Sequence, residues 1–529
     1  MDTPVPLATA TRTDTMISVA EDGPSSSTSS PTNLDCPTTP PSLSRSTTIQ
    51  VIDTRPRMDG GAKAWLVVLG SFLIHSFCFA PTETIFGIFE LHYHDIFPRA
   101  NASSIAFVGT VGSAVTYLFG FVAGIVADRF GFRATALFGT LLMTSSLVLS
   151  SFVTQLWHLF LTQGIMFGVG ASLAYYPAVA APSHWFANKR GLATGLAVSG
   201  VGAGGSVLAP LTHWLIDRLE IQWTLRILGL FCLVLCGTAS CLISERKDLP
   251  TYESVPQEGF PEEEQEGMEM SSDISKSSKK TDLSAVEEAR QLQEQAKPGF
   301  FESLKVFRDP QFLALTMAEL AASIGYLIPL YYMQSKPKIV DDMHVQEDME
   351  VYSYAVFIGL TPQRGAMILG FSNGASFTGR IGLGILSDYI SNAKVLLLCA
   401  WMTAFAVTIL WTFSTTFASF LSMALIFGFF AGGYVSLVPV AVAESFGTKQ
   451  VASNIGLMYA ASGLGILGGS PLAGYLLDST LHTSYLPVTM TAGASMTLGA
   501  MCVSSWVYFR WRALRAAKAA RAAAEAVAH

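Results

Sequence analysis

Long apolar runs constrain this 529-residue chain more than any other feature. Half of its residues are hydrophobic and only 13% are charged, whereas a soluble chain carries about a quarter charged residues. The apolar residues fall into runs near the length of about 20 residues that crosses a bilayer as a helix. The sequence therefore predicts an all-α membrane protein with twelve transmembrane helices in two six-helix halves. The predicted spans are Ala64–Gly87, Ser104–Ala127, Ala134–Phe152, Leu156–Ala180, Leu192–Leu215, Thr224–Ser244, Gln311–Met333, Ala366–Ser387, Lys394–Phe413, Phe417–Val440, Ala452–Leu477 and Val488–Phe509.

Two matching signals, one in each half, indicate an internal repeat. Gly124-Ile-Val-Ala-Asp128-Arg129-Phe-Gly131-Phe-Arg133 closes the second run, and Gly384-Ile-Leu-Ser-Asp388-Tyr389-Ile-Ser391 closes the eighth. Similar residues at corresponding points of two halves are typical of repeated transporters. We expect the carboxylates to pair with neighbouring basic groups and to hold one conformation. The predicted gate residues are Asp128, Arg129, Arg133 and Asp388.

Composition divides the chain into five regions. A Ser-, Thr- and Pro-rich segment, 1–62, is predicted to be a disordered cytosolic tail. The halves cover 63–244 and 306–512, an acidic linker, 245–305, joins them, and a second tail covers 513–529. Lys and Arg lie mostly in loops on one side, so we expect both termini in the cytosol, with the chain in the plasma membrane. The external loops include a polar stretch near 336–352 and the sequon at Asn101, which we expect to stay unmodified because it lies close to a span.

The polar segments carry none of the motifs of catalysis. They contain no metal-ligand cluster, nucleophile elbow or phosphate-binding loop, so we predict neither an enzyme nor a cofactor site. The net charge of −7 arises largely in the acidic linker, and no basic patch suggests nucleic acid. The lipid bilayer is the expected surrounding.

Glycines recur in the fifth span of each half. The fifth span carries Gly191, Gly195 and Gly200, and the eleventh carries Gly456, Gly463 and others. Small residues at helical spacing let helix backbones approach closely. Ordinary tight packing is one explanation; recurrence in both halves favours a seam along which the halves move.

Together these motifs resemble the major facilitator superfamily over about Asp59 to Arg512. The opening Asp59-Gly60-Gly61-Ala-Lys-Ala64-Trp65 resembles the monocarboxylate porter family, and Asn188-Lys189-Arg190-Gly191-Leu-Ala-Thr-Gly195 and Asn373-Gly374-Ala375-Ser376-Phe-Thr-Gly379-Arg380 resemble its fungal branch. The resemblance implies a secondary carrier that works by alternating access.

The resemblance to the animal members does not extend to two residues that bear on their substrate. Animal members carry an Asp one turn before the arginine of span 8, where this chain has Ser376, and a lysine late in span 1, where it has Glu83. Their proton–lactate chemistry is therefore not carried over. The stretch 336–352 also looks longer than the family's loop, and is an external lid, an ordinary loop or a gene-model insertion.

Charged and polar residues within spans are candidate sites, because burying them in a bilayer is costly. Arg380 lies inside span 8, behind Asn373 and Ser376, and an arginine holds a carboxylate through two parallel hydrogen bonds. The alternative is that Arg380 pairs with an internal carboxylate and only locks helices.

The remaining candidates concern protons and the cavity wall. Glu319, inside span 7, is either a protonatable coupling group or a residue that lines the pore or pairs helices. Glu83 and His75 of span 1 are further proton-coupling candidates. Aromatic candidates for the wall are Tyr175, Tyr176, Tyr331 and Tyr332.

The sequence thus predicts a secondary active transporter of a small organic anion, a monocarboxylate or related carboxylate, with protons as the candidate coupling ion. The alternative is an exporter of a larger, less charged metabolite, which a large apolar cavity and indifference to Arg380 would favour. A non-transporting nutrient sensor and a membrane enzyme are the remaining alternatives.

Overall fold

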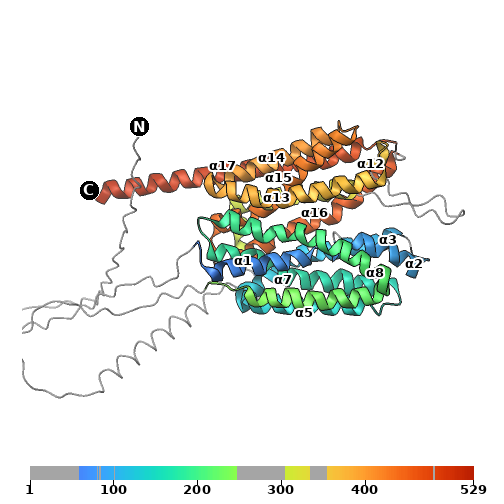
Figure 1. Ribbon diagram of the computed structural model, residues 1–529. Coiled ribbons are helices and arrows are strands. Elements are labelled where there is room, and N and C mark those ends of the chain that lie inside the picture. Colours follow the sequence, from blue (N-terminus) through green and yellow to red (C-terminus); the bar gives the residue numbers. More distant parts are fainter. Residues whose placement is uncertain are drawn as a thin grey trace, which may run out of the picture. The chain divides into compact units, whose positions relative to one another are not determined.

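The computed structural model describes residues 59–79, 81–82, 85–100, 102–246, 304–333, 354–480 and 483–528. All of them lie in one compact unit of the chain. Within these ranges the regular structure is helical and no strand occurs, which confirms the all-α prediction (Figure 1). Glu83, Asn101, the segment 336–352 and nearly all of the linker and N-terminal tail lie outside the described residues, so the predictions made for them remain predictions.

The first half runs from α1 to α8. Its elements are α1 (Ala62–Cys78), α2 (Phe86–Ile96), α3 (Ala102–Leu118), α4 (Gly120–Phe130), α5 (Phe132–Ser150), α6 (Leu156–Leu159), η2 (Phe160–Met166), α7 (Phe167–Trp185) and α8 (Arg190–Leu242).

The second half runs from η3 to α17. Its elements are η3 (Leu304–Arg308), α11 (Pro310–Met333), α12 (Tyr354–Phe357), α13 (Pro362–Tyr389), α14 (Asn392–Phe405), η4 (Ala406–Trp411), α15 (Phe417–Phe446), α16 (Val451–Ser479) and α17 (Leu486–Ala528).

Helices cover all twelve predicted spans, although their boundaries differ. Among the described residues, eight helices are long and apolar enough to cross a membrane, and the α3–α4 pair, bent by 45°, makes a ninth candidate span. One of the eight, α8, covers the predicted fifth and sixth spans, with only Glu220 at φ 64 between them. The first predicted span reached Gly87, but α1 ends at Cys78. Pro81 follows, and a proline cannot donate the backbone N–H that would continue the helix.

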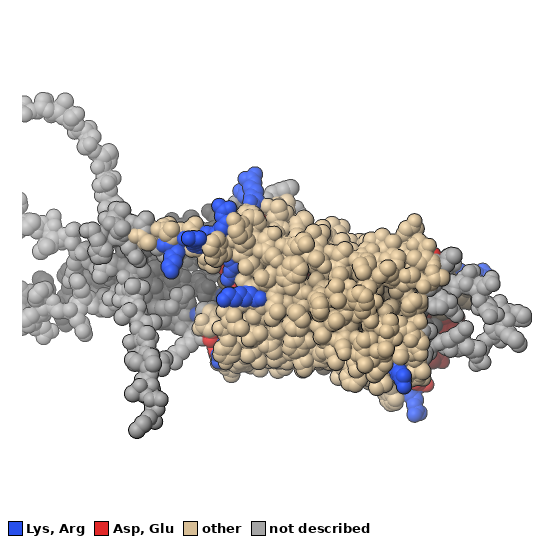
Figure 2. All heavy atoms as spheres, turned by 90° about the horizontal axis from the view of Figure 1, so that it is seen from above, with Lys and Arg blue, Asp and Glu red and all other residues tan. Residues whose placement is uncertain are grey.

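The outer surface fits a bilayer. Figure 2 shows Lys and Arg towards the two ends of the visible face, with a broad uncharged zone between them. Large apolar side chains such as Phe138, Trp214 and Leu230 are more than half exposed. Water-soluble monomers rarely expose apolar surface on this scale, so the helices are those of a multi-pass membrane protein.

We call one end of the bundle the terminal side. It contains the first turn of α1 and the charged end of the transmembrane part of α17 (Figure 1). The N–H of Asp59 donates to the carbonyl of Trp185 there. At the same end Arg510 of α17 pairs with Glu444 of α15, with 2.8 Å between the nitrogen and oxygen atoms.

Two seams join the halves. In the first seam α8 packs on α13, and in the second α16 packs on α4 and α3. A Cβ atom at Gly195 would collide with the carbonyl oxygen of Arg380, and one at Gly456 with the carbonyl oxygen of Gly120. The seams therefore require glycine because the backbones touch. Gly200 differs, since its neighbour is Phe72 of α1 in its own half.

We expect Gly456→Ala to destabilise the second seam by about 1–3 kcal/mol, because the added methyl group must displace backbone. Gly474→Ala in the same helix is the matched control, since nothing lies within 4 Å of a Cβ atom there. The measurement is thermal unfolding of purified protein in detergent. Equal melting temperatures for the two variants would show that the seam tolerates the added methyl group.

Candidate functional site

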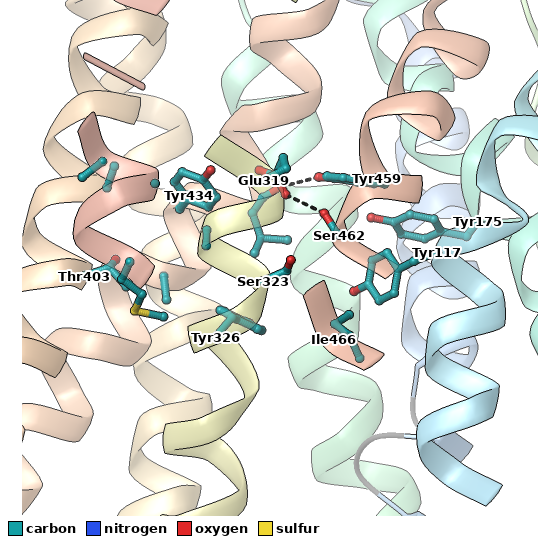
Figure 3. A pocket seen from close by; sticks show the side chains of 17 residues that line it. Tyr117, Tyr175, Glu319, Ser323, Tyr326, Thr403, Tyr434, Tyr459, Ser462 and Ile466 are labelled. Atoms are coloured by element: carbon teal, nitrogen blue, oxygen red, sulfur yellow. Dashed lines mark hydrogen bonds between the residues drawn. The ribbon is translucent and has the colours of Figure 1, made fainter. Parts of the chain in front are cut away.

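A pocket of about 720 Å³, a volume that includes open solvent at its mouth, lies among the helices of the second half and reaches the first. Most of its wall comes from α11, α14, α15, α16 and α17, whereas Tyr117 of α3 and Tyr175 of α7 come from the first half (Figure 3). The lining residues are Tyr117, Tyr175, Glu319, Ala322, Ser323, Tyr326, Ala400, Thr403, Ala431, Tyr434, Val435, Tyr459, Ser462, Ile466, Met496, Gly499 and Ala500.

Glu319 is the one charged side chain among these lining residues. It is buried, and its Oε2 accepts a hydrogen bond of 3.2 Å from the hydroxyl of Ser462. Its Oε1 has no hydrogen-bond partner among the described residues, and neither does the hydroxyl of Tyr434, which lies beside the carboxylate in Figure 3. A buried carboxylate with so few donors requires a proton or a donor from a ligand. The geometry thus keeps Glu319 as a candidate for proton coupling.

Tyrosines form the wall where the halves meet. Tyr459 of α16 has its ring centroid 6.1 Å from that of Tyr117 and 6.4 Å from that of Tyr175. Tyr176 also contacts Tyr459, at 6.3 Å, but it packs against Gly120 and is not part of the lining. Of the tyrosines suggested for the cavity wall, Tyr175 lies in the pocket lining, and its contact with a substrate stays a prediction. The side chain of Tyr331 is not described.

Sequence reasoning missed Tyr434, Tyr459 and Ser462. Each is an uncharged hydroxyl-bearing residue in a largely apolar span. Such residues commonly bond within their own helix or face a neighbour. The one available signal is their spacing, since Tyr459 and Ser462 lie three residues apart on one helix face.

Arg380 does not line this pocket. It is buried in the first seam, where its Nη1 donates to the carbonyl of Val198 at 2.7 Å. Neither Asn373 nor Ser376 lines the pocket either. The alternative in which Arg380 pairs with Glu319 is not what the structure shows, because Arg380 bonds to α8 and Glu319 bonds to Ser462 of α16.

His75 is also fully buried outside the lining. Its Nδ1 lies 2.6 Å from the carbonyl oxygen of Ser71. The imidazole packs edge-on against the ring of Tyr175, with 5.0 Å between centroids. These contacts favour a structural role in positioning that tyrosine.

Both repeated carboxylates bind across the seams. Asp388 accepts the N–H groups of Gly191 at 2.7 Å and Leu192 at 2.9 Å. Asp128 accepts the N–H group of Ser453 at 2.9 Å and a short hydrogen bond from its hydroxyl. Each carboxylate therefore lies at the N-terminus of the fifth helix of the opposite half, where the helix dipole favours negative charge.

The hydrogen bonds to Asp128 and Asp388 come from groups other than the basic side chains that the sequence suggests. They are donated by backbone N–H groups and a hydroxyl. Arg133 donates instead to the carbonyl of Ile243 at 3.2 Å. The guanidinium of Arg129 lies 6.0 Å from the ring centroid of Phe130.

The fold and the site define a membrane transporter: two repeated helical halves enclose a central pocket and meet in two seams at one end. The family model of the Major Facilitator Superfamily matches residues 64–361 and 353–528. The chain therefore belongs to the major facilitator superfamily.

Known proteins with similar sequences are transporters. MFS transporter asaE of Aspergillus flavus is 26% identical over 80% of this chain and 81% of its own. The agnestins efflux protein AgnL12 of Paecilomyces divaricatus is 26% identical over 89% and 94%, and mouse monocarboxylate transporter 12 is 27% identical over 83% and 84%. The proton:xylose symporter XylE shares the fold, with a TM-score of 0.58, 14% identity and coverage of 83% of this chain and 95% of its own.

We expect Asp388→Asn to loosen both seams, because a hydrogen bond to a charged group is worth about 1 kcal/mol more than a neutral one. A cysteine introduced at Ala452, which is fully buried in the second seam, reports opening through its maleimide labelling rate in detergent. The background lacks Cys36 and the exposed Cys241. Labelling should accelerate about fivefold.

Asp217→Asn is the control, since this carboxylate is exposed and lies 3.7 Å from His213 of its own helix, away from both seams. An unchanged labelling rate in Asp388→Asn would show that this carboxylate does not hold the seams together. The same substitution at Asp128 should lower transport at normal surface abundance.

Proposed function

We propose that this transporter exports an aromatic metabolite larger than a monocarboxylate, in exchange for protons that bind Glu319. One observation carries the proposal: the pocket is lined by five tyrosines, several hydroxyls and a single carboxylate, and neither Lys nor Arg is among its lining residues. Aromatic rings prefer offset or edge-on contacts with other rings, which the tyrosine wall offers.

The unpaired Oε1 of Glu319 and the hydroxyl of Tyr434 add a polar requirement. A ligand hydroxyl would satisfy both groups, because its O–H can donate to Oε1 and its oxygen can accept from Tyr434. A proton on Glu319 would replace the ligand's donor when the ligand leaves. The carboxyl of Glu319 would thus bind either a proton or the substrate's donor, but not both at once. This exclusion couples the two movements, so that protons and substrate cross the membrane in opposite directions. Two relatives named as efflux proteins support the direction of this transport.

A second candidate is the carboxylate carrier predicted from the sequence. It is favoured by the guanidinium of Arg380, which is buried with one hydrogen bond while its Nε has no partner among the described residues. A substrate carboxylate could accept from that nitrogen if the first seam opens. The relative named as a monocarboxylate transporter supports this alternative.

We expect Glu319→Gln to abolish net export, because glutamine cannot take up and release the coupling proton. The measurement compares metabolites inside and outside cells that lack the transporter, overproduce it, or carry the variant at matched surface abundance. Extracellular accumulation should fall to the level of the deletion strain. Full export by Glu319→Gln would rule out its coupling role, and Asp217→Asn controls for loss of a carboxylate.

The two candidate substrates differ in their response to Arg380. Export of an uncharged aromatic compound should keep its half-saturation concentration in Arg380→Ala. Transport of a carboxylate should lose affinity in Arg380→Ala and regain only part of it in Arg380→Lys, since lysine lacks the planar two-pronged geometry. Loss of affinity with that partial recovery would favour the carboxylate carrier.

We further propose that the terminal side faces the cytosol, as the distribution of Lys and Arg in the loops favours, and that the membrane is the plasma membrane. Epitope tags at the N-terminus and near residue 270 should be inaccessible to antibody in intact cells, whereas a tag within 336–349 should be accessible. Surface staining of either of the first two tags would reverse the orientation.

A further inference from the structure

Asp59 holds the turn that leads into α8. Its Oδ1 accepts the N–H groups of Ala187 at 2.7 Å, Asn188 at 2.6 Å and Lys189 at 3.1 Å. Its Oδ2 accepts the side-chain amide of Asn188 at 2.7 Å. Four donors on one carboxylate make this turn one of the most heavily bonded features at the terminal side.

The same stretch of backbone meets the carboxylate of the other half. Directly after the N–H groups held by Asp59 come those of Gly191 and Leu192, which Asp388 accepts. Residues 187–192 thus lie between a carboxylate of their own half and one of the opposite half. Arg190 closes the same turn from within, because its Nε donates to the carbonyl of Phe186 at 3.1 Å.

The second seam is built differently. There Asp128 receives a hydroxyl hydrogen bond from Ser453 in addition to its backbone N–H group. Leu192, the second donor in the first seam, has no hydroxyl to offer. The hydrogen bonds of Asp388 in the first seam therefore depend on how well the backbone of residues 191–192 is aimed at it.

We propose that Asp59 is a positioning residue for the first seam: by fixing the turn 187–189 it aims the N–H groups of Gly191 and Leu192 at Asp388. The role goes beyond the proposed function and needs no assumption about the substrate. The backbone of Asp59 has φ 72, a conformation that aspartate tolerates better than most residues but that still costs free energy. The four hydrogen bonds of its carboxylate offset that cost.

Hydrogen–deuterium exchange of the full-length transporter in nanodiscs tests the proposal. Asp59→Gly removes the carboxylate and relieves the backbone strain, since glycine adopts positive φ freely. Exchange should accelerate about tenfold, or 1.4 kcal/mol, in residues 187–195 and also in residues 451–456 of the second seam. The distant segment is decisive because separation of the halves exposes both seams, whereas a local defect in the turn does not.

Two variants sharpen the comparison. Asp59→Asn keeps an acceptor oxygen and tolerates positive φ, so its exchange should lie between that of wild type and Asp59→Gly. Gly60→Ala is the matched control, since nothing lies within 4 Å of a Cβ atom there, and it should match wild type. Unchanged exchange in residues 417–440 shows that the fold is intact.

Faster exchange confined to residues 187–190 in Asp59→Gly would overturn the proposal, because Asp59 would then hold only its own turn. Unchanged exchange throughout would overturn it as well. Neither result would bear on Glu319 or on the substrate, because the experiment uses neither a proton gradient nor a transported compound.

Discussion

The closed end of this transporter depends on carboxylates that accept backbone N–H groups across the boundary between its halves. Asp128 and Asp388 each reach the first turn of a helix that belongs to the other half. Such contacts are charge-assisted and directional, yet they bury no hydrophobic side chain. They can therefore break and form again as the halves rock, whereas the packing within each half persists.

Close backbone approach is what brings these carboxylates within reach. Gly195 and Gly456 let α8 and α16 touch the backbones of α13 and α4. Eight residues before Asp388 stands Arg380, and eight residues before Asp128 stands Gly120. The position that holds the buried guanidinium of Arg380 in the first seam thus holds Gly120 in the second seam. There the ring of Tyr176 fills the space beside the glycine. The repeat gives the halves a common gate but different surroundings beside it.

How much the sequence could reveal depended on the kind of residue. Charges inside apolar spans are rare, so Glu319 and Arg380 were found at once, and the repeat pointed to Asp128 and Asp388. The sequence could not show that Arg380 faces a seam and Glu319 a pocket, because that depends on the rotation of each helix about its axis, which is set by packing against neighbours. Tyr459 escaped for a related reason: a lone tyrosine in an apolar span is usually a packing residue, and only the fold places it opposite Tyr117 and Tyr175.

The unequal contribution of the two halves to the pocket lining has a consequence for transport. A ligand can shift the balance between two conformations only through contacts that differ between them. Most of the lining belongs to the second half and would move with it as a unit, so those contacts alone would bind a substrate about equally in both states. Tyr117 and Tyr175 are the lining residues that belong to the first half, and they meet Tyr459 where the halves join. The energy by which a bound substrate favours one state must therefore come largely from these rings, whereas in the proposed exchange Glu319 would distinguish a loaded pocket from a protonated one.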